Sequence, residues 1–177
     1  IGSLEAVIQI EMNKIFNCDL SEAHLFFCGG GSCGQGWLPE ESTSFIKSVG
    51  VTDELCFPYK SCNLDCDEKN PNWKDRVIKV SKRGFARYEQ GIKKALNEYG
   101  PLITCFDVYE HFGSYKDGIY EHVWGNYEGG HCVTLVGYND DPGYWICKNS
   151  WGSGWGDEGY FNIKYNECNI CEEGYYF

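Results

Sequence analysis

The spacing of apolar residues changes near Gly100-Pro101, and this change constrains the fold more than any other feature of the chain. Before it, apolar residues recur at the three- and four-residue intervals of helices buried on one face. After it, short segments rich in β-branched and aromatic residues predict strands over residues 102–108, 132–138, 144–148 and 160–165. The sequence therefore predicts an α+β fold, mostly helical in its first part and mostly antiparallel strand in its second.

The helical part has recognisable starts and stops. The first predicted helix, residues 1–16, begins without a capping residue, which indicates a helix cut in its middle. A second begins after a cap at Ser21 or Asp19 and runs through Phe27. Further elements are predicted as helices over residues 39–49 and 88–99, a strand over residues 75–85, and a loop over residues 52–73. Because Leu4 and Ile8 lie beside the cut end, we expect them to lack packing partners and the isolated chain to fold poorly.

Charge excludes several classes of partner. The 177 residues hold 15 Lys and Arg against 26 Asp and Glu, a formal net charge of -11. A nucleic acid or an anionic membrane surface attracts a basic face, so neither is an expected partner. No apolar run approaches the roughly 20 residues that span a bilayer.

Eleven cysteines favour disulfides and an oxidising compartment. The number is odd, so at least one thiol is free or is bonded outside the chain. Cys105, Cys132 and Cys147 stand among apolar residues and are predicted to be small buried side chains. A four-thiolate zinc site from the pairs Cys62/Cys66 and Cys168/Cys171 is the less favoured alternative, and we expect no metal and no cofactor.

Two motifs lie close together in the strand-rich part. Gly129-Gly130-His131-Cys132-Val133 is followed by Lys148-Asn149-Ser150-Trp151-Gly152-Ser153-Gly154-Trp155-Gly156. The region from Gly129 to Phe161 closely resembles the papain family of cysteine proteases, as do segments 20–22, 33–37 and 56–59. The resemblance implies a two-lobe fold, truncated at its N-terminus, with a helical lobe over residues 1–74 and an antiparallel β-barrel-like lobe over residues 75–177.

The resemblance also implies a catalytic machinery. A Cys thiolate is the nucleophile of such enzymes, and a His lowers the thiol pKa from about 8.5 and later protonates the leaving amine. His131 matches that His, and Asn149 matches the Asn that orients it. The nucleophile's stretch, Cys-Gly-Ser-Cys-Trp-Ala-Phe, is not in the chain. We expect it upstream or in another chain, so that the 177 residues alone are inactive. Cys132 is rejected as a substitute because neighbouring strand residues face opposite sides.

The same resemblance implies substrate-binding positions. These are Gln35, Gly36, Trp37, Leu38, Gly130 and Trp151. In the family, backbone groups near Gly36 pair with an extended peptide, and Trp37 and Leu38 begin the main specificity pocket. A large apolar wall there favours an apolar side chain at the second residue before the cut. Gly34-Gln35-Gly36 departs from the common Asn-Gly-Gly pattern, and a Gln side chain would narrow or polarise the pocket.

The remaining cysteines and histidines have structural interpretations. Cys28, Cys56, Cys62 and Cys66 are disulfide candidates whose connectivity the sequence leaves open. Cys33 occupies a half-cystine position whose family partner lies in the missing stretch, so we expect a free thiol or a bond to another chain. The other histidines, His24, His111 and His122, are interpreted as structural.

The sequence thus favours a cysteine endopeptidase acting on peptide or protein substrates. The alternative is an inactive relative that binds peptides or serves in an assembly. Family members are commonly lysosomal, vacuolar or secreted, which agrees with the cysteine content.

Overall fold

The structure is a computed structural model that describes residues 1–15, 17–60 and 64–177. It divides into two compact units, which we call the first unit (residues 1–84 with Phe177) and the second unit (residues 85–176). The boundary lies ten residues beyond the one expected between residues 74 and 75. Each unit has its own hydrophobic core.

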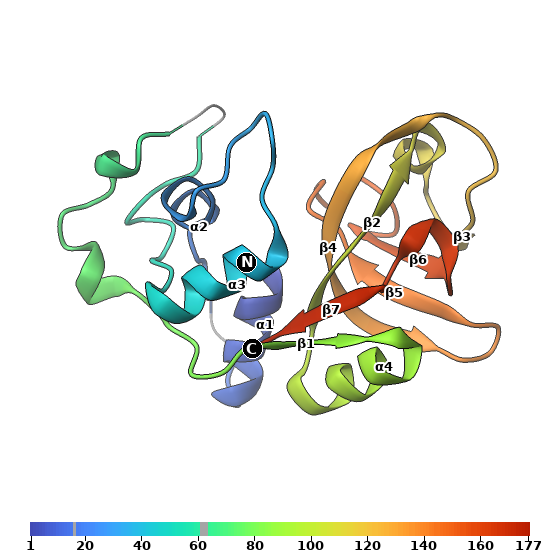
Figure 1. The fold of residues 1–177 in the computed structure, drawn as a ribbon, viewed down its shortest axis with the longest axis horizontal. Helices are drawn as coiled ribbons and strands as arrows, with labels where there is room; N and C mark the ends of the chain where they lie inside the picture. Colours follow the sequence, from blue (N-terminus) through green and yellow to red (C-terminus); the bar gives the residue numbers. More distant parts are fainter. Residues whose placement is uncertain (16, 61–63) are drawn as a thin grey trace. The chain divides into compact units, whose positions relative to one another are not determined.

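The first unit is helical where it has regular structure. Its elements are α1 (Gly2–Glu11), α2 (Glu22–Gly29), α3 (Pro39–Ser48) and the short 3-10 helices η1 (Cys66–Glu68) and η2 (Trp73–Arg76) (Figure 1). The core joins α1 and α3 to loop residues through Leu4, Leu20, Ile46 and Val51. Leu4 is 1% exposed and Ile8 packs against the same core, so the expectation that both lack packing partners is wrong.

Local chemistry sets the ends of these helices. Of the two predicted caps, Ser21 rather than Asp19 begins α2, because its hydroxyl oxygen accepts a hydrogen bond from the His24 N–H at 2.9 Å. The same hydroxyl donates to the Phe57 carbonyl at 2.6 Å. The first helix ends at Glu11, earlier than predicted. Asn13, two residues later, has a φ of 47°, which is outside helical geometry.

The strand predicted over residues 75–85 is largely absent. Trp73–Arg76 forms η2, and Ile78 makes an isolated antiparallel bridge with Val51. The regular strand is β1 (Gly84–Arg87), at the end of the predicted range. A strand needs a partner along its length, and here the pairing is confined to the hydrogen bonds between Val51 and Ile78.

The second unit is built on a sheet in which the described residues supply seven strands, in the order β1-β7-β2-β4-β5-β6-β3. The predicted strands are present as β2 (Leu102–Tyr109), β4 (Tyr127–Asn139), β5 (Tyr144–Lys148) and β6 (Tyr160–Lys164). The predicted helix is α4 (Tyr88–Tyr99). The short segments β3 (Ile119–Tyr120), β7 (Glu173–Tyr176), η3 (Glu110–Ser114) and η4 (Glu167–Asn169) were not predicted. The α+β class is therefore confirmed.

Alternation along β2 shows how the sheet buries one face. Leu102, Phe106 and Val108 are buried, while the residues between them are partly exposed, apart from the buried Thr104. On the buried side they join aromatic and aliphatic residues of the other strands, including Leu135, Trp145 and Phe161. This core is the platform on which the candidate site rests.

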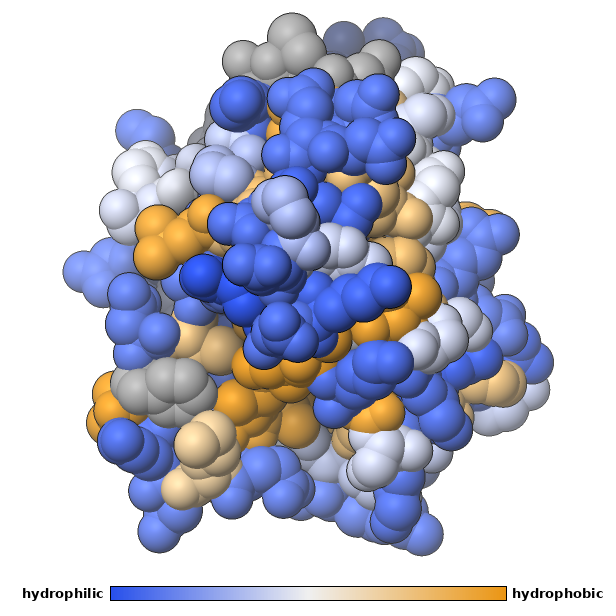
Figure 2. Space-filling model, turned by 90° about the vertical axis from the view of Figure 1, so that its left-hand side faces the viewer, coloured by the Kyte–Doolittle hydropathy of each residue, from blue (hydrophilic) through white to orange (hydrophobic). Residues whose placement is uncertain are grey.

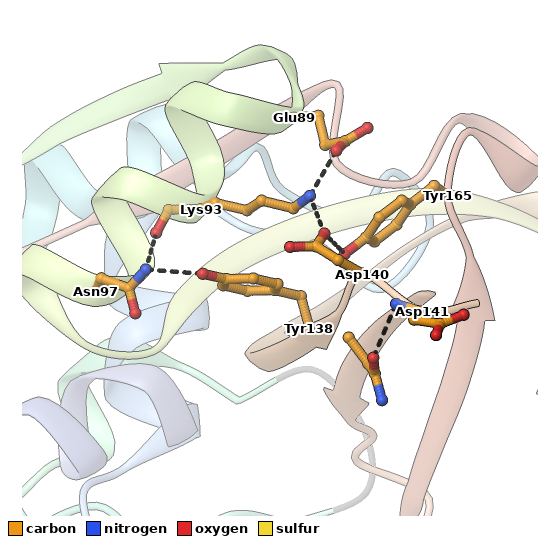
Figure 3. Close-up of polar contacts among 8 residues, drawn as sticks. Glu89, Lys93, Asn97, Tyr138, Asp140, Asp141 and Tyr165 are labelled. Carbon is orange, nitrogen blue, oxygen red and sulfur yellow. Dashed lines mark hydrogen bonds and ion pairs between the residues drawn. The ribbon is translucent and has the colours of Figure 1, made fainter. Parts of the chain in front are cut away.

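A buried lysine ties α4 to the strands. The Lys93 ammonium is bonded to the carboxylates of Glu89 and Asp140, and it lies 4.4 Å from the ring centroid of Tyr165 (Figure 3). Desolvation alone would lower the pKa of Lys93, but the hydrogen bonds to Asp140 and Glu89 outweigh it and raise that pKa above its ordinary value. The Lys93 side chain therefore stays charged.

Among the described cysteines two disulfides form, and they correct part of the sequence analysis. Cys28 is bonded to Cys66, one of the pairings left open. Cys56 carries a buried free thiol, so its assignment to a disulfide is wrong, and Cys62 lies outside the described residues. Cys105 is bonded to Cys132, so their prediction as free buried thiols is also wrong. The reason is register, since the two residues are placed directly opposite each other on β2 and β4. Cys147 is free and fully buried, as predicted.

The surface of the first unit mixes charge with apolar side chains. Figure 2 shows hydrophobic side chains in an interrupted band between hydrophilic ones. Large exposed apolar residues of this unit include Leu38 and Leu55, which are 65% and 85% exposed. Within the described parts of the chain, no helix is both long and apolar enough to cross a membrane.

Candidate active site

The strand pair β2–β4 positions His131. His131 lies on β4 directly opposite Phe106 of β2, and their ring centroids are 5.9 Å apart in an edge-on arrangement. Phe106 is 3% exposed and is therefore fixed in the core. Because neighbouring residues of a strand face opposite sides, His131 shares the side of Phe106, while Cys132 points to the other side.

Asn149 reaches the same place from the end of β5. The register pairs Lys148, the last residue of β5, with Thr134 of β4. The Asn149 N–H then donates to the Gly159 carbonyl at 2.9 Å, which closes the loop that follows. The Asn149 side chain is buried, with the residue 7% exposed. Two neighbouring strands thus bring together side chains that are 18 residues apart in sequence.

The contact between these side chains defines their chemistry. Asn149 Oδ1 lies 2.8 Å from His131 Nε2 and also accepts the Ser150 N–H at 2.8 Å. The second bond identifies this atom as the amide oxygen, which accepts and cannot donate. Nε2 therefore carries the proton of that hydrogen bond. His131 Nδ1 is the ring nitrogen left for proton exchange with another group.

Aromatic rings cover this pair. The Trp151 ring centroid lies 5.3 Å from that of His131, with the planes tilted by 32°. The Trp151 indole also packs against the rings of Phe112 and Trp155, with centroid separations of 5.4 Å and 5.0 Å. Trp151 remains 43% exposed, so it stands between the imidazole and solvent while its inner side rests on the core.

Glycines shape the loop that carries Trp151. Gly156 has a φ of +60°, and a Cβ at this position would lie 2.5 Å from the Tyr160 carbonyl oxygen. The Gly159 N–H donates to the Trp155 carbonyl at 2.8 Å. Trp155 packs against the core, and its indole N–H donates to the Gly113 carbonyl at 3.3 Å.

The free thiols of the second unit are poorly suited to nucleophilic attack. Burial raises the pKa of Cys147 well above its ordinary value and that of Cys171 to about 12. Burial, followed by the Glu167 carboxylate, raises the pKa of Cys168 to about 12. A thiol with such a pKa supplies little thiolate near neutral pH.

The other substrate-binding candidates belong to the first unit. Gln35 and Gly36 lie in an exposed turn closed by the Gly36 N–H, which donates to the Ser32 carbonyl at 2.8 Å. Trp37 packs over Gly29, where an added Cβ would lie 2.0 Å from the indole. The absence of a side chain at Gly29 is thus what allows the Trp37 indole to pack against α2.

A groove opens beside Trp37 and Leu38. Its volume is about 820 Å³, and its other lining residues are Gly29, Gly30, Glu40, Glu41, Ser44, Phe45 and Ser48. The rings of Trp37 and Phe45, whose centroids are 6.2 Å apart, form an aromatic wall of the groove. Glu40 and Glu41 make its lining acidic. Gln35 is not among the lining residues, so the groove itself is bounded by Trp37 rather than by the Gln side chain.

The alternative zinc site loses one of its proposed ligands. Cys66 is bonded to Cys28 and cannot bind a metal as a thiolate. Residues 1–15, 17–60 and 64–177 contain no group of three or more potential metal ligands.

Sequence reasoning missed several contributors to the site. Phe106, which contacts His131, was predicted only as part of a strand, and Phe112, which contacts Trp151, lies outside every predicted element. Phe45, Glu40 and Glu41 were predicted only as parts of the helix over residues 39–49. The signal that could have found Phe106 is the pairing register, which fixes the residue opposite His131.

Comparisons with known proteins place these observations in context. The sequence profile of the papain family cysteine proteases matches residues 1–177. The chain is 41% identical over 157 residues to "Cathepsin B-like CP3" of Giardia intestinalis, covering 82% of this chain and 52% of that protein. It is 32% identical over 180 residues to "Cathepsin B-like protease 1" of Arabidopsis thaliana, covering 87% and 48%.

Solved structures show the same fold. The procathepsin B S9 of Trypanosoma congolense superposes with a TM-score of 0.84 at 27% identity, covering 98% of this chain and 64% of that one. The digestive procathepsin L 3 of Tenebrio molitor larval midgut gives 0.83 at 26% identity, covering 98% and 59%. The chain thus spans about half the length of the curated relatives it matches.

Proposed function

Because the chain belongs to the papain family of cysteine proteases, we propose that it supplies the acid–base and substrate-binding residues of a cysteine endopeptidase whose nucleophilic Cys lies outside the 177 residues. The observation that supports this most directly is the 2.8 Å contact between His131 Nε2 and Asn149 Oδ1. A histidine whose tautomer is fixed by an uncharged acceptor, with its second nitrogen free, is suited to exchange a proton with a thiol.

The proposed reaction has two halves. His131 Nδ1 takes the proton of the Cys thiol, and the thiolate sulfur attacks the carbonyl carbon of the peptide bond. As the C–N bond breaks, His131 returns the proton to the leaving amine, and a thioester remains. The imidazole then takes a proton from water, whose oxygen attacks the thioester carbonyl, and the thiolate leaves as the carboxylic acid forms.

The neighbours of His131 have defined tasks in this scheme. Asn149 holds the ring in one orientation through both proton transfers, because its oxygen accepts from Nε2 whether Nδ1 is protonated or not. Trp151 shields that hydrogen bond from water and thereby strengthens it. A Cβ added at Gly130 would have no heavy atom within 4 Å, so the space beside this glycine is open. This space lets a peptide backbone approach the strand next to His131.

The groove beside Trp37 and Leu38 supports a preference among substrates. Its aromatic wall favours an apolar side chain or the aliphatic stem of a long one. The acidic lining by Glu40 and Glu41 favours substrates that carry positive charge and disfavours acidic ones. We expect Gly36 and Gln35 to contact the peptide backbone beside this groove.

The test uses the product of the complete encoding gene. An electrophilic peptide probe that alkylates active-site thiols is incubated with the protein, and intact mass counts the labels. One label per molecule that fails to form in His131→Ala, but forms in the matched variant His122→Ala, supports the peptidase. A protein that is folded, takes up no label and cleaves no peptide is instead the inactive peptide-binding or assembly component.

The compartment is part of the same proposal. Disulfides such as Cys28–Cys66 and Cys105–Cys132 persist in oxidising surroundings. They support a lysosomal, vacuolar or secreted location. Localisation of the tagged product of the complete gene tests this, and a cytosolic distribution contradicts it.

A further inference from the structure

A disulfide lies on the rung of the strand pair next to His131. Cys105 of β2 and Cys132 of β4 are directly opposite each other, with their Cα atoms 3.9 Å apart, and they are covalently joined. The adjacent rung pairs Phe106 with His131. The covalent bond therefore ties together the two backbone segments that carry the imidazole and the buried ring against which it packs.

On the other side of His131 the two strands are paired through the backbone, but β4 has no side chains there. Gly130 and Gly129 precede His131 on β4, and glycines give a strand no side chains for cross-strand packing. The register between the two strands then shifts between Val108 and Tyr109. The register stays unbroken through Gly130 and Gly129, but cross-strand packing by side chains of both strands begins at His131, and the disulfide on the next rung is the first covalent link along it.

We propose that the Cys105–Cys132 disulfide is a positioning element that holds His131 at Asn149 Oδ1, so that catalysis requires this bond to be intact. The catalytic half of the proposal rests on the proposed function. The geometric half concerns the imidazole alone and is measurable without turnover.

The position of the bond makes it accessible to thiols. Cys132 is exposed, and alternation directs it away from the core side that holds Phe106. A thiolate of a small thiol attacks Sγ of Cys132, forming a mixed disulfide and releasing Cys105 as a thiolate that takes up a proton. A second thiol then releases Cys132, giving two Cys thiols and one molecule of the oxidised reagent.

This chemistry sets two opposite requirements on one enzyme. The nucleophile works only as a free thiol, whereas the link beside His131 works only as a disulfide. We therefore expect low concentrations of dithiothreitol to raise activity, because they free the nucleophilic thiol. Higher concentrations should lower activity as they reduce the Cys105–Cys132 disulfide. Alkylation of the two thiols, detected by mass spectrometry, reports that reduction.

The decisive variant removes the bond and keeps strand packing. In the product of the complete gene, Cys105→Val/Cys132→Val replaces the link with a β-branched pair suited to opposed strand positions. We expect kcat to fall about 10- to 100-fold with KM nearly unchanged, as a displaced catalytic group produces. Further addition of dithiothreitol then no longer lowers activity. A folded variant with unchanged kcat and pH profile would overturn the proposal.

A second measurement does not depend on turnover. The proton on His131 Nε2 is hydrogen-bonded in the structure, and its NMR signal reports that bond directly. We expect the signal to broaden or disappear in the Cys105→Val/Cys132→Val variant, and also when the Cys105–Cys132 disulfide is reduced. The matched control Cys28→Val/Cys66→Val removes the disulfide of the first unit and leaves the signal in place. A signal that persists without the Cys105–Cys132 bond contradicts the geometric half, even if the protein proves inactive.

Discussion

The Oδ1 atom of Asn149 lies 2.8 Å from Nε2 of His131 and accepts a second hydrogen bond from the Ser150 N–H. The pair of bonds fixes both the amide orientation and the imidazole tautomer. The site therefore has a preset direction for proton transfer, through Nδ1.

Replacing Asn149 tests this orientation. In Asn149→Ala the imidazole loses its acceptor, and we expect kcat of the complete enzyme to fall about 10- to 100-fold with little change in KM. In Asn149→Asp a carboxylate faces Nε2 and stabilises the imidazolium, so we expect the alkaline limb of the pH–rate profile to move to higher pH. Steady-state kinetics over a pH series checks both variants. Identical pH–rate profiles for Asn149→Asp and the unchanged enzyme contradict the role of Asn149 as the hydrogen-bond acceptor of His131.

Trp151 provides a separate test of water exclusion. In Trp151→Ala solvent reaches the His131–Asn149 hydrogen bond, and we expect kcat to fall about tenfold, the upper part of the effect of one net hydrogen bond. Trp151→Phe keeps a ring against Phe112 and retains more of the activity. The matched control is Trp124→Ala, which truncates a Trp that is 55% exposed. Equal losses of kcat in Trp151→Ala, Trp151→Phe and Trp124→Ala would contradict a specific role of Trp151 in excluding water.

Lys93 is expected to support the stability of the second unit. Lys93→Met leaves Asp140 and Glu89 without their shared cation and removes the charge from the aromatic surroundings (Figure 3). Because the two carboxylates are partly exposed, we expect a loss of about 1–2 kcal/mol in the free energy of unfolding, below that of a fully buried pair. Urea unfolding measures it. The neighbouring exposed Lys94→Met is the matched control, and equal stability of the two variants contradicts the role of Lys93.

His24 is expected to make the first unit sensitive to acid. Burial, followed by the nearby Lys69, lowers the pKa of His24 to about 4, against about 6.5 in an unfolded chain. Between these pH values the unfolded state binds more protons than the folded state, so stability falls as pH falls, by at most about 1.4 kcal/mol per pH unit. His24→Gln has no titrating group and should flatten the dependence below pH 6.5. Denaturant unfolding at pH 7 and pH 4.5 checks it, and parallel curves for the two proteins contradict it.

The sequence by itself determined the main helices and strands that carry the candidate site and the residue types available there. Apolar spacing predicted α4 and the strands β2, β5 and β6 nearly to their ends, because helix and strand periods are local properties. The segment around His131 and Asn149 pointed to a proton-transferring pair because its residue types and order are specific. The start of α2 followed from the hydroxyl of Ser21, whose partner is three residues away.

The tertiary structure decided everything that depends on register and packing. Strand patterning could not predict that Cys105 lies opposite Cys132 or that Phe106 lies opposite His131, because a shift of one residue turns every side chain to the other face. It also could not predict the charged Lys93 among aromatic rings, since an amphipathic helix pattern places lysine in solvent. Local sequence specifies which groups are available. Long-range pairing decides which of them meet, because the free energy of those contacts arises only when distant segments pack together.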